Sequence, residues 1–540
     1  MNSASTSIPL LLLSTLCCLA GCPSAGGSRT GAAGARDAVR AHRAGGELAT
    51  HYGASGPAEL DELEARVMAT LTRAADQAGR SAPQADRAAQ LAARDICRAL
   101  PAQGPPPSTV VEFALRSYGL VDPPPHMVIA GMPPGLEKEV LEQLGSRFRQ
   151  ILGNKPFSRV GIGITTPAGS PAYRRVLVAL LEHRIEFEPL PRRMTLGQRV
   201  TLRFKPAPSH HSVHLVVTTP AGKTEKGPAS GGRMMTGQLT CGERGIYQVE
   251  VTGVGGYGPE VLANFPVYCD KDPPTEVRVG EVKRLADDDR AIEAELLEGT
   301  NAIRRRAKLK PLVTNARLTE VARRHSQDMR DNGFVGHVSP TTGRPTDRLQ
   351  AAKVLHLVVR ENVAQAYSTE EALRELMGSP AHRENILATD VTQLGIGVAV
   401  DRSGTTPFML VTQLFMKPGK AYDPRTAMAD VLAAIRRSRS RTGLPPLKPD
   451  DQLSRLAGNY VRNLLAGADR KAEADATLAQ ALRQLGGRFT RVDGLHVRVS
   501  VIDALEQAEE LSRKRYTHLG IGVGRSGEQV VIFLLLAGSK

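Results

Sequence analysis

The hydrophobic pattern is most regular between residues 315 and 415. It opens with apolar residues at the helical spacing i, i+3, i+4, i+7. The predicted helical face consists of Leu318, Val321, Ala322, His325 and Met329. Glycines at positions 333 and 336 break this helix and begin a loop. Two runs typical of β-strands, residues 394–400 and 408–415, close the stretch and are joined by turn residues. The pattern predicts one domain that contains both helices and strands.

Between the first helix and these strands, the sequence predicts two short helices with defined starts. Ser368 with Glu371 three residues later has the spacing of a capping box. Ser379 followed by Pro380 can cap and start the next helical turn, which presents residues 382–387.

Three polar side chains in this stretch are candidates for chemistry: His337, Glu361 and His382. Two imidazoles and a carboxylate can bind zinc and leave a coordination position open for water or a carbonyl oxygen. Without a metal, the same trio can act as general acid and base, because histidine titrates near neutral pH. The alternative is that both histidines form hydrogen bonds that fix loops. Spacing alone does not separate these readings.

Six ordered pieces of the stretch resemble the CAP superfamily (cysteine-rich secretory proteins, antigen 5 and pathogenesis-related 1), and in particular its bacterial branch. The pieces are residues 336–340, 347–348, 361–362, 379–387, 394–398 and 412–415. The resemblance implies an α-β-α sandwich with a cleft lined by His337, Glu361 and His382, which can hold a divalent metal, most often zinc.

The chain departs from the family pattern at two positions, and three further residues are expected to support the site. Relatives often carry a second cleft glutamate and a tryptophan, where this chain has Ser379 and Leu376, and the chain contains no tryptophan. Next to the cleft residues, we expect Asn362, Arg383 and Asn385 to support the site. Asn362 would satisfy loop backbone groups, and the other two would brace a helix start.

The length of 540 residues indicates several domains. Residues 425–540 repeat the outline of the middle stretch: Leu519-Gly520-Ile521-Gly522-Val523 follows the pattern of residues 394–398, and Tyr460 stands where His325 stands. A fainter echo occurs before residue 190, with a strand-like run at 160–164. We therefore predict three CAP-like units, at 58–190, 285–420 and 425–540, of which only the middle one keeps the polar cluster.

A different pattern occupies residues 191–270. Short alternating runs separated by glycine and proline predict a small immunoglobulin-like β-sandwich. Cys241 and Cys269 fall inside it, and they can pair in an oxidising compartment. The fold class expected for the whole chain is therefore multidomain α+β.

The N-terminus resembles a bacterial lipoprotein signal. An apolar run at residues 10–20 has the length of a secretion signal and is too short to span a membrane. It ends in Leu-Ala-Gly-Cys, which would make residues 1–21 the signal peptide and Cys22 the lipidated first residue of the mature chain. Residues 22–57 would form a flexible tether. Because Pro23 is not the aspartate that retains such proteins in the inner membrane, we expect anchoring in the outer membrane if the source is a two-membrane bacterium. The alternative is a plain secretory signal that is cut nearby without lipidation.

The net charge of +15, from 70 basic and 55 acidic residues, is compatible with binding to anionic polymers or membrane headgroups. It is equally compatible with arginines that cover solvated helix faces. No nucleic-acid-binding motif is present. We therefore expect an extracytoplasmic binding module for a lipid, a sterol or an anionic envelope polymer. A metal-assisted envelope hydrolase and a structural interaction scaffold are the alternatives, and the sequence does not decide whether the chain is an enzyme.

Overall fold

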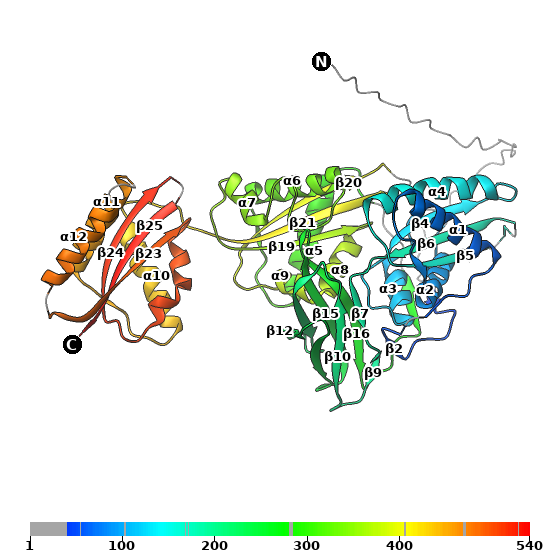
Figure 1. Cartoon of the computed structure of the whole chain (residues 1–540), viewed down its shortest axis with the longest axis horizontal. Coiled ribbons are helices and arrows are strands. Elements are labelled where there is room, and N and C mark those ends of the chain that lie inside the picture. Colours follow the sequence, from blue (N-terminus) through cyan, green and yellow to red (C-terminus); the bar gives the residue numbers. More distant parts are fainter. Residues whose placement is uncertain are drawn as a thin grey trace, which may run out of the picture.

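The structure, a computed structural model, describes residues 40–54, 56–101, 104–167, 169–170, 172–279, 285–403, 407–467, 471–485, 487–527 and 529–539. The predicted signal peptide, Cys22 and the predicted tether up to residue 39 lie outside the described residues. The tether prediction is wrong for residues 40–43 and 51–52, which form paired strands. Three α/β units and one two-sheet β-domain follow one another along the chain, with the two-sheet domain between the first and middle units (Figure 1).

The middle unit contains the polar cluster. Its elements are α5 (Asp289–Arg306), β18 (Val313–Thr314), α6 (Ala316–Asn332), α7 (Pro345–Ala351), β19 (His356–Ala366), α8 (Thr369–Gly378), α9 (Pro380–Ile386), β20 (Gln393–Asp401) and β21 (Phe408–Pro418). The strand order is β18-β20-β21-β19, with only β18 parallel to its neighbour. Helices α6 and α7 pack on one face of this sheet, and α5, α8 and α9 pack on the other. The unit therefore has three layers.

Helix α6 lies very close to the sheet because two glycines of β20 face it. A Cβ built at Gly395 would come within 2.4 Å of the backbone of Leu318, and one built at Gly397 within 2.0 Å of the nitrogen of Arg323. The helix is capped at its start by the side chain of Asn315 and ends at Gly333, whose φ of 66° suits glycine. Together these contacts fix where the following His337 loop begins.

Strand β19 is an element that the sequence pattern did not predict. The pattern assigned Glu361 to no helix or strand, and in the structure it lies within β19, opposite Leu414 of β21. The strand was missed because polar residues at 360–362 interrupt the alternation of apolar and polar positions. The side chains of Glu361 and Asn362 are nevertheless buried, because they pair with other polar groups inside the unit.

The first unit has the same strand order as the middle unit. Its sheet is β3-β5-β6-β4, again with one short parallel strand at the edge. Its elements are α1 (Glu62–Gln77), β3 (Gln84–Ala85), α2 (Arg87–Arg98), α3 (Ser108–Ser117), β4 (His126–Met132), α4 (Glu137–Asn154), β5 (Arg159–Thr165) and β6 (Arg174–Leu181). Helix α4 is a further element that the sequence pattern did not predict.

The third unit repeats that strand order once more, as β22-β24-β25-β23. Its elements are α10 (Ala427–Arg441), β22 (Lys448–Pro449), α11 (Asp451–Leu465), α12 (Lys471–Gln484), β23 (Phe489–Val499), η2 (Ile502–Gln507), η3 (Glu509–Ser512), β24 (His518–Ser526) and β25 (Gln529–Ser539).

The two-sheet domain, which we call the β-sandwich, spans residues 185–269. Its sheets are β13-β14-β10-β7 and β12-β11-β15-β16-β9, and they share one apolar core. The strands are β7 (Ile185–Phe187), β9 (Arg193–Met194), β10 (Arg199–Pro206), β11 (His211–Thr218), β12 (Thr224–Pro228), β13 (Ser230–Gly231), β14 (Met235–Thr240), β15 (Gly245–Gly255) and β16 (Gly258–Cys269). The immunoglobulin-like assignment stays a prediction.

Two small pairings tie the N-terminal segment to the β-sandwich and to the segment that follows it. They are β1 (Arg40–Arg43) with β17 (Glu276–Val279), and β2 (His51–Tyr52) with β8 (Leu190–Pro191). Within the residues that the structure covers, no helix combines the length and the apolar character needed to cross a membrane.

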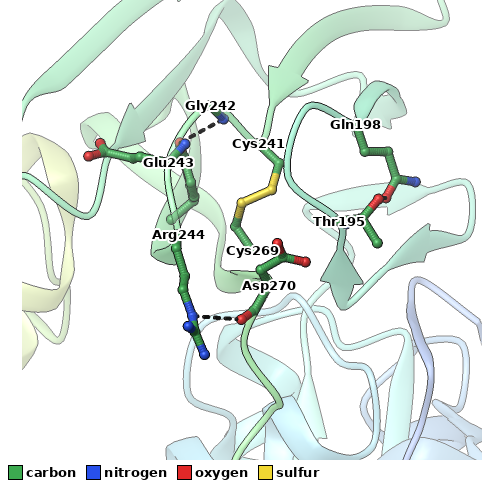
Figure 2. Close-up of a disulfide and its surroundings, with 9 residues drawn as sticks. Thr195, Gln198, Cys241, Gly242, Glu243, Arg244, Cys269 and Asp270 are labelled. Atoms are coloured by element: carbon green, nitrogen blue, oxygen red, sulfur yellow. Dashed lines mark hydrogen bonds between the residues drawn. A yellow bond between two sulfur atoms is a disulfide. The ribbon is translucent and has the colours of Figure 1, made fainter.

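The β-sandwich contains a disulfide between Cys241 and Cys269, whose Cα atoms lie 5.6 Å apart (Figure 2). Both residues are buried in the shared core. Nearby, the guanidinium of Arg244 donates to the carbonyl oxygen of Asp270, 3.1 Å away. Cys97, in the first unit, is buried and has no disulfide partner. The bridge thus joins the end of β16 to the loop that follows β14.

We expect peptide mapping of the oxidised chain without reduction to recover the Cys241 and Cys269 peptides covalently joined, with Cys97 as a free thiol. The bond restricts a loop of the unfolded chain, so reduction should lower the melting temperature of the β-sandwich. Recovery of Cys241 and Cys269 as free thiols from an oxidised preparation would contradict this pairing.

Candidate functional site

The structure brings His337 and Glu361 into direct contact. His337 lies in the loop after α6, Glu361 lies in β19, and the Nδ1 atom of His337 is 3.0 Å from Oε1 of Glu361. The other carboxylate oxygen of Glu361 accepts a hydrogen bond from Arg348 of α7 at 2.5 Å. The side chains of Glu361 and Arg348 are only 3% and 5% exposed, so this is a buried ion pair.

The surroundings of Glu361 decide its charge. Burial by itself raises the pKa of this carboxyl, but the hydrogen bond from His337 and the charges of Arg348 and His337 outweigh that effect, and its pKa lies below the usual value. Glu361 is therefore a carboxylate that accepts the Nδ1 hydrogen of His337. In the neutral form of His337, this contact places the ring hydrogen on Nδ1 and leaves Nε2 as the acceptor.

His382 lies on α9, where a network of amide side chains holds it. The Nδ2 atom of Asn362 donates to the carbonyl oxygen of His382 at 3.2 Å, and Asn385 donates to Asn362 at 2.8 Å and to the carbonyl oxygen of Glu361 at 3.1 Å. Although the side chain keeps partial contact with solvent, burial and then the charge of His337 lower the pKa of His382 to about 3. Its imidazole is therefore neutral at physiological pH.

The loop that carries His337 is held from several sides. The Nε2 atom of buried His325 lies 2.9 Å from the carbonyl oxygen of Gly336, and Arg348 donates to the carbonyl oxygen of His337 at 3.0 Å. Asp328 of α6 accepts hydrogen bonds from the hydroxyls of Ser339 and Thr341. Buried His325 therefore helps to fix the position of the loop that carries His337.

The predicted set of three metal ligands does not fit the side chains as they lie. Both oxygens of Glu361 are engaged, one by His337 and one by Arg348. Among the residues that the structure describes, no group of three or more His, Cys, Asp or Glu side chains is arranged to hold a metal ion. Glu361 orients His337 instead, and no step in the function proposed below uses a metal.

We predicted that Arg383 braces the start of a helix, but in the structure its side chain lines a groove. This groove of about 530 Å³ lies between α5, α8 and α9, and the buried Nε atom of Arg383 has no hydrogen-bond partner among the described residues. The remaining lining residues are Gly299, Ile303, Arg306, Ala307, Leu373, Arg374, Met377 and Leu387. The groove therefore has an apolar floor and three arginines.

Sequence reasoning missed the residues that the β-sandwich places against the middle unit. Glu250 of β15 accepts hydrogen bonds from the hydroxyl of Ser379 at 2.5 Å and from the backbone nitrogen of Ala381 at 3.0 Å. A carboxyl group from another domain thus reaches Ser379, at the start of α9. No local signal could have found Glu250, because an isolated glutamate on an alternating strand reads as solvent-facing.

The other contact that the sequence did not reveal involves Arg348. It was part of a matching piece, Asp347-Arg348, but nothing in the spacing assigned it a partner. Its ion pair with Glu361 joins α7 to β19 across the tertiary structure, over a separation of 13 residues.

Comparisons with known proteins agree with this geometry. Residues 297–415 match the model of CAP, the cysteine-rich secretory protein family. Over 128 residues the chain is 35% identical to the "uncharacterized protein YkwD" of Bacillus subtilis (strain 168), which covers 24% of this chain and 50% of that protein. Over 107 residues it is 37% identical to the "uncharacterized membrane protein YlbC" of the same organism, covering 20% of this chain and 31% of that protein.

A solved structure is also similar in part. It is the crystal structure of "an extracellular protein containing a SCP domain" from Bacillus anthracis strain Ames, with 26% identity and a TM-score of 0.23, covering 32% of this chain and 65% of that one. The chain thus spans half or less of the curated relatives that it matches. The family match, the three layers and the contact between His337 and Glu361 agree on one conclusion: residues 297–415 are a CAP domain of the cysteine-rich secretory protein family.

Proposed function

We propose that this chain is an extracytoplasmic binding protein whose CAP domain takes an anionic amphiphile of the cell envelope, in the groove between α5, α8 and α9. The observation that carries the proposal is the groove lining. An apolar floor that includes Ile303, Leu373 and Met377 suits an acyl chain, and arginines at 306, 374 and 383 suit a carboxylate or phosphate. Ligands of this class are anionic lipids and fatty acids.

The extracytoplasmic location has independent support. The chain carries a disulfide, and such bonds persist in oxidising compartments. The Leu-Ala-Gly-Cys sequence ending at Cys22 supports a lipid anchor, and Pro23 after it favours the outer membrane of a two-membrane bacterium, although both residues lie outside the described ones. A basic net charge of +15 favours an anionic partner surface.

We also propose that the first and third units are CAP folds that lack the cluster. The shared strand order supports this. So does a shared packing device: Cβ atoms built at Gly161 and Gly520 would come within 2.1 and 2.4 Å of the backbones of α2 and α11, as Gly395 does with α6. Of the three units, only the middle one is proposed to bind the amphiphile, in the groove between α5, α8 and α9.

The hydrolase alternative cannot use Glu361 as its general base. Glu361 is held by Arg348 and its pKa is lowered, so it is a weak base.

We expect the full chain to bind a fluorescent C16 fatty-acid anion, and Arg383→Gln to weaken this binding by roughly tenfold, because one charged donor is lost. The matched control is Arg324→Gln, an exposed arginine on α6 outside the groove. Fluorescence titration measures both affinities. The uncharged C16 alcohol should bind more weakly than the acid. Equal affinity for acid and alcohol, or equal loss in both variants, would contradict the groove as the site.

A further inference from the structure

The β-sandwich lies directly against the part of the middle unit that carries the cluster. Strand β15 contacts α9, and both are labelled in Figure 1. The turn between β15 and β16 contacts the His337 loop through backbone hydrogen bonds. We propose that the β-sandwich is a reversible cover over this side of the middle unit and that its docking controls access to His337 and His382. The covering segment is part of this chain, and the inference does not depend on the ligand of the groove.

The first docking contact involves the turn between α8 and α9. Glu250, with no exposed surface, accepts hydrogen bonds from Ser379 and from the nitrogen of Ala381, the residue before His382. Asn264 of β16 adds a hydrogen bond to the carbonyl oxygen of Gly378 at 3.2 Å. The β-sandwich therefore holds both the end of α8 and the start of α9.

The second docking contact involves the loop of the other histidine. The carbonyl oxygen of Tyr257 accepts hydrogen bonds from the backbone nitrogens of His337 and Val338, both at 2.9 Å. The ring of Tyr257 stacks on Phe334, with centroids 5.2 Å apart. There is no space for a methyl group here, since a Cβ at Gly336 would lie 2.4 Å from the Cβ of Tyr257.

The nature of these contacts favours reversible docking. They are mainly hydrogen bonds to backbone groups, with one aromatic contact, and interfaces of this kind between domains permit relative motion. Glu250 is fully buried and its partners are the hydroxyl of Ser379 and the backbone nitrogen of Ala381, neither of which carries a charge, so its ionised form bears a desolvation penalty. Domain folding does not require this contact, because each domain has its own apolar core.

The docked β-sandwich touches the His337 loop itself. A Cβ built at Gly258 would lie 3.0 Å from the side chain of Val338 and 3.3 Å from the Cβ of His337, whose side chain is 15% exposed in this state. Both histidine-bearing segments have backbone amides whose acceptors lie in the other domain. A macromolecular ligand that approaches the cluster from this side has to displace the β-sandwich first.

The test uses hydrogen exchange of the full chain and two variants that oppose docking at different points. Glu250→Ala removes the acceptor, and Gly336→Ala inserts a methyl group against Tyr257. Glu250→Gln, which keeps the shape and can keep the hydrogen bonds, and Gly378→Ala, where nothing lies within 4 Å of the new Cβ, are the matched controls. A second readout is the rate of carbethoxylation of His337 and His382, relative to exposed His211.

We expect exchange at residues 334–340 and 379–383 to accelerate at least tenfold in the two opposing variants and to stay unchanged in the controls, with β20 protected throughout. Carbethoxylation of both histidines should accelerate in parallel. In the unmodified chain, the amides of His337, Val338 and Ala381 should exchange before those of β20. If they exchange only together with β20, or if imidazole reactivity stays constant when these amides open, the β-sandwich is not a reversible cover.

Discussion

Replacing Arg348 by methionine is expected to destabilise the middle unit by about 3–5 kcal/mol, because it leaves the carboxylate of Glu361 buried without its cation. The substitution also frees the carbonyl oxygens of His337 and Gly343, which Arg348 binds at 3.0 and 2.7 Å. Because the chain has several domains, the free energy is best measured from hydrogen exchange at β19 and β21 rather than from one unfolding transition.

Two variants sharpen this experiment. Arg324→Met removes an arginine whose side chain is 75% exposed, and should change the same free energy by less than about 0.5 kcal/mol. Combining Arg348→Met with Glu361→Gln should cost less than the sum of the two single changes, because no charge is then left unpaired. A loss below about 1 kcal/mol for Arg348→Met alone would show that the ion pair does not form in solution.

Docking of the β-sandwich is expected to weaken as pH rises through neutrality. Burial raises the pKa of Glu250 from 4.5 to about 7, partly offset by its hydrogen bonds with Ser379 and Ala381 and by the charge of Lys226. Between pH 4.5 and about pH 7, the carboxyl of Glu250 is protonated in the docked state and ionised in the undocked state. The contribution of Glu250 to docking is therefore complete below pH 4.5 and is lost as pH rises through about 7.

The measurement is the protection factor of the Ala381 amide, corrected for the intrinsic pH dependence of exchange. It should fall roughly thirtyfold between about pH 5.5 and about pH 8.5. His382 does not contribute in this range, because its pKa of about 3 keeps it neutral. Glu250→Gln cannot ionise and should remove the dependence while keeping protection. A slope that persists in Glu250→Gln would assign it to another group.

Local sequence was sufficient where a short segment carries its own stop or start signal. Ser368 and Ser379 cap their helices as predicted, and Gly333 ends α6 with a positive φ. The runs at 394–400 and 408–415 became β20 and β21, because continuous apolar segments of that length suit a strand covered on both faces. These features depend on residues within a few positions of one another.

The sequence also placed His337 and Glu361 in one site, through the resemblance rather than through spacing. It did not predict that Glu361 lies on a strand or that Arg348 occupies its second oxygen. Arg383 was expected to brace a helix start, but its side chain lines the groove. Spacing cannot show these outcomes, because the direction of a long side chain depends on packing between elements.

What the sequence determined by itself is the CAP domain, the end of α6, the starts of α8 and α9, and the residues of the cluster, since periodicity and capping are local and the motif pieces are ordered along the chain. Only the tertiary structure decided the environment of that cluster. Alternation in β15 puts Tyr247, Val249 and Val251 in the core and Glu250 on the opposite face, which the sequence assigns to solvent. The middle unit covers that face, and burial by a distant segment turns Glu250 from a surface carboxylate into a contact between domains.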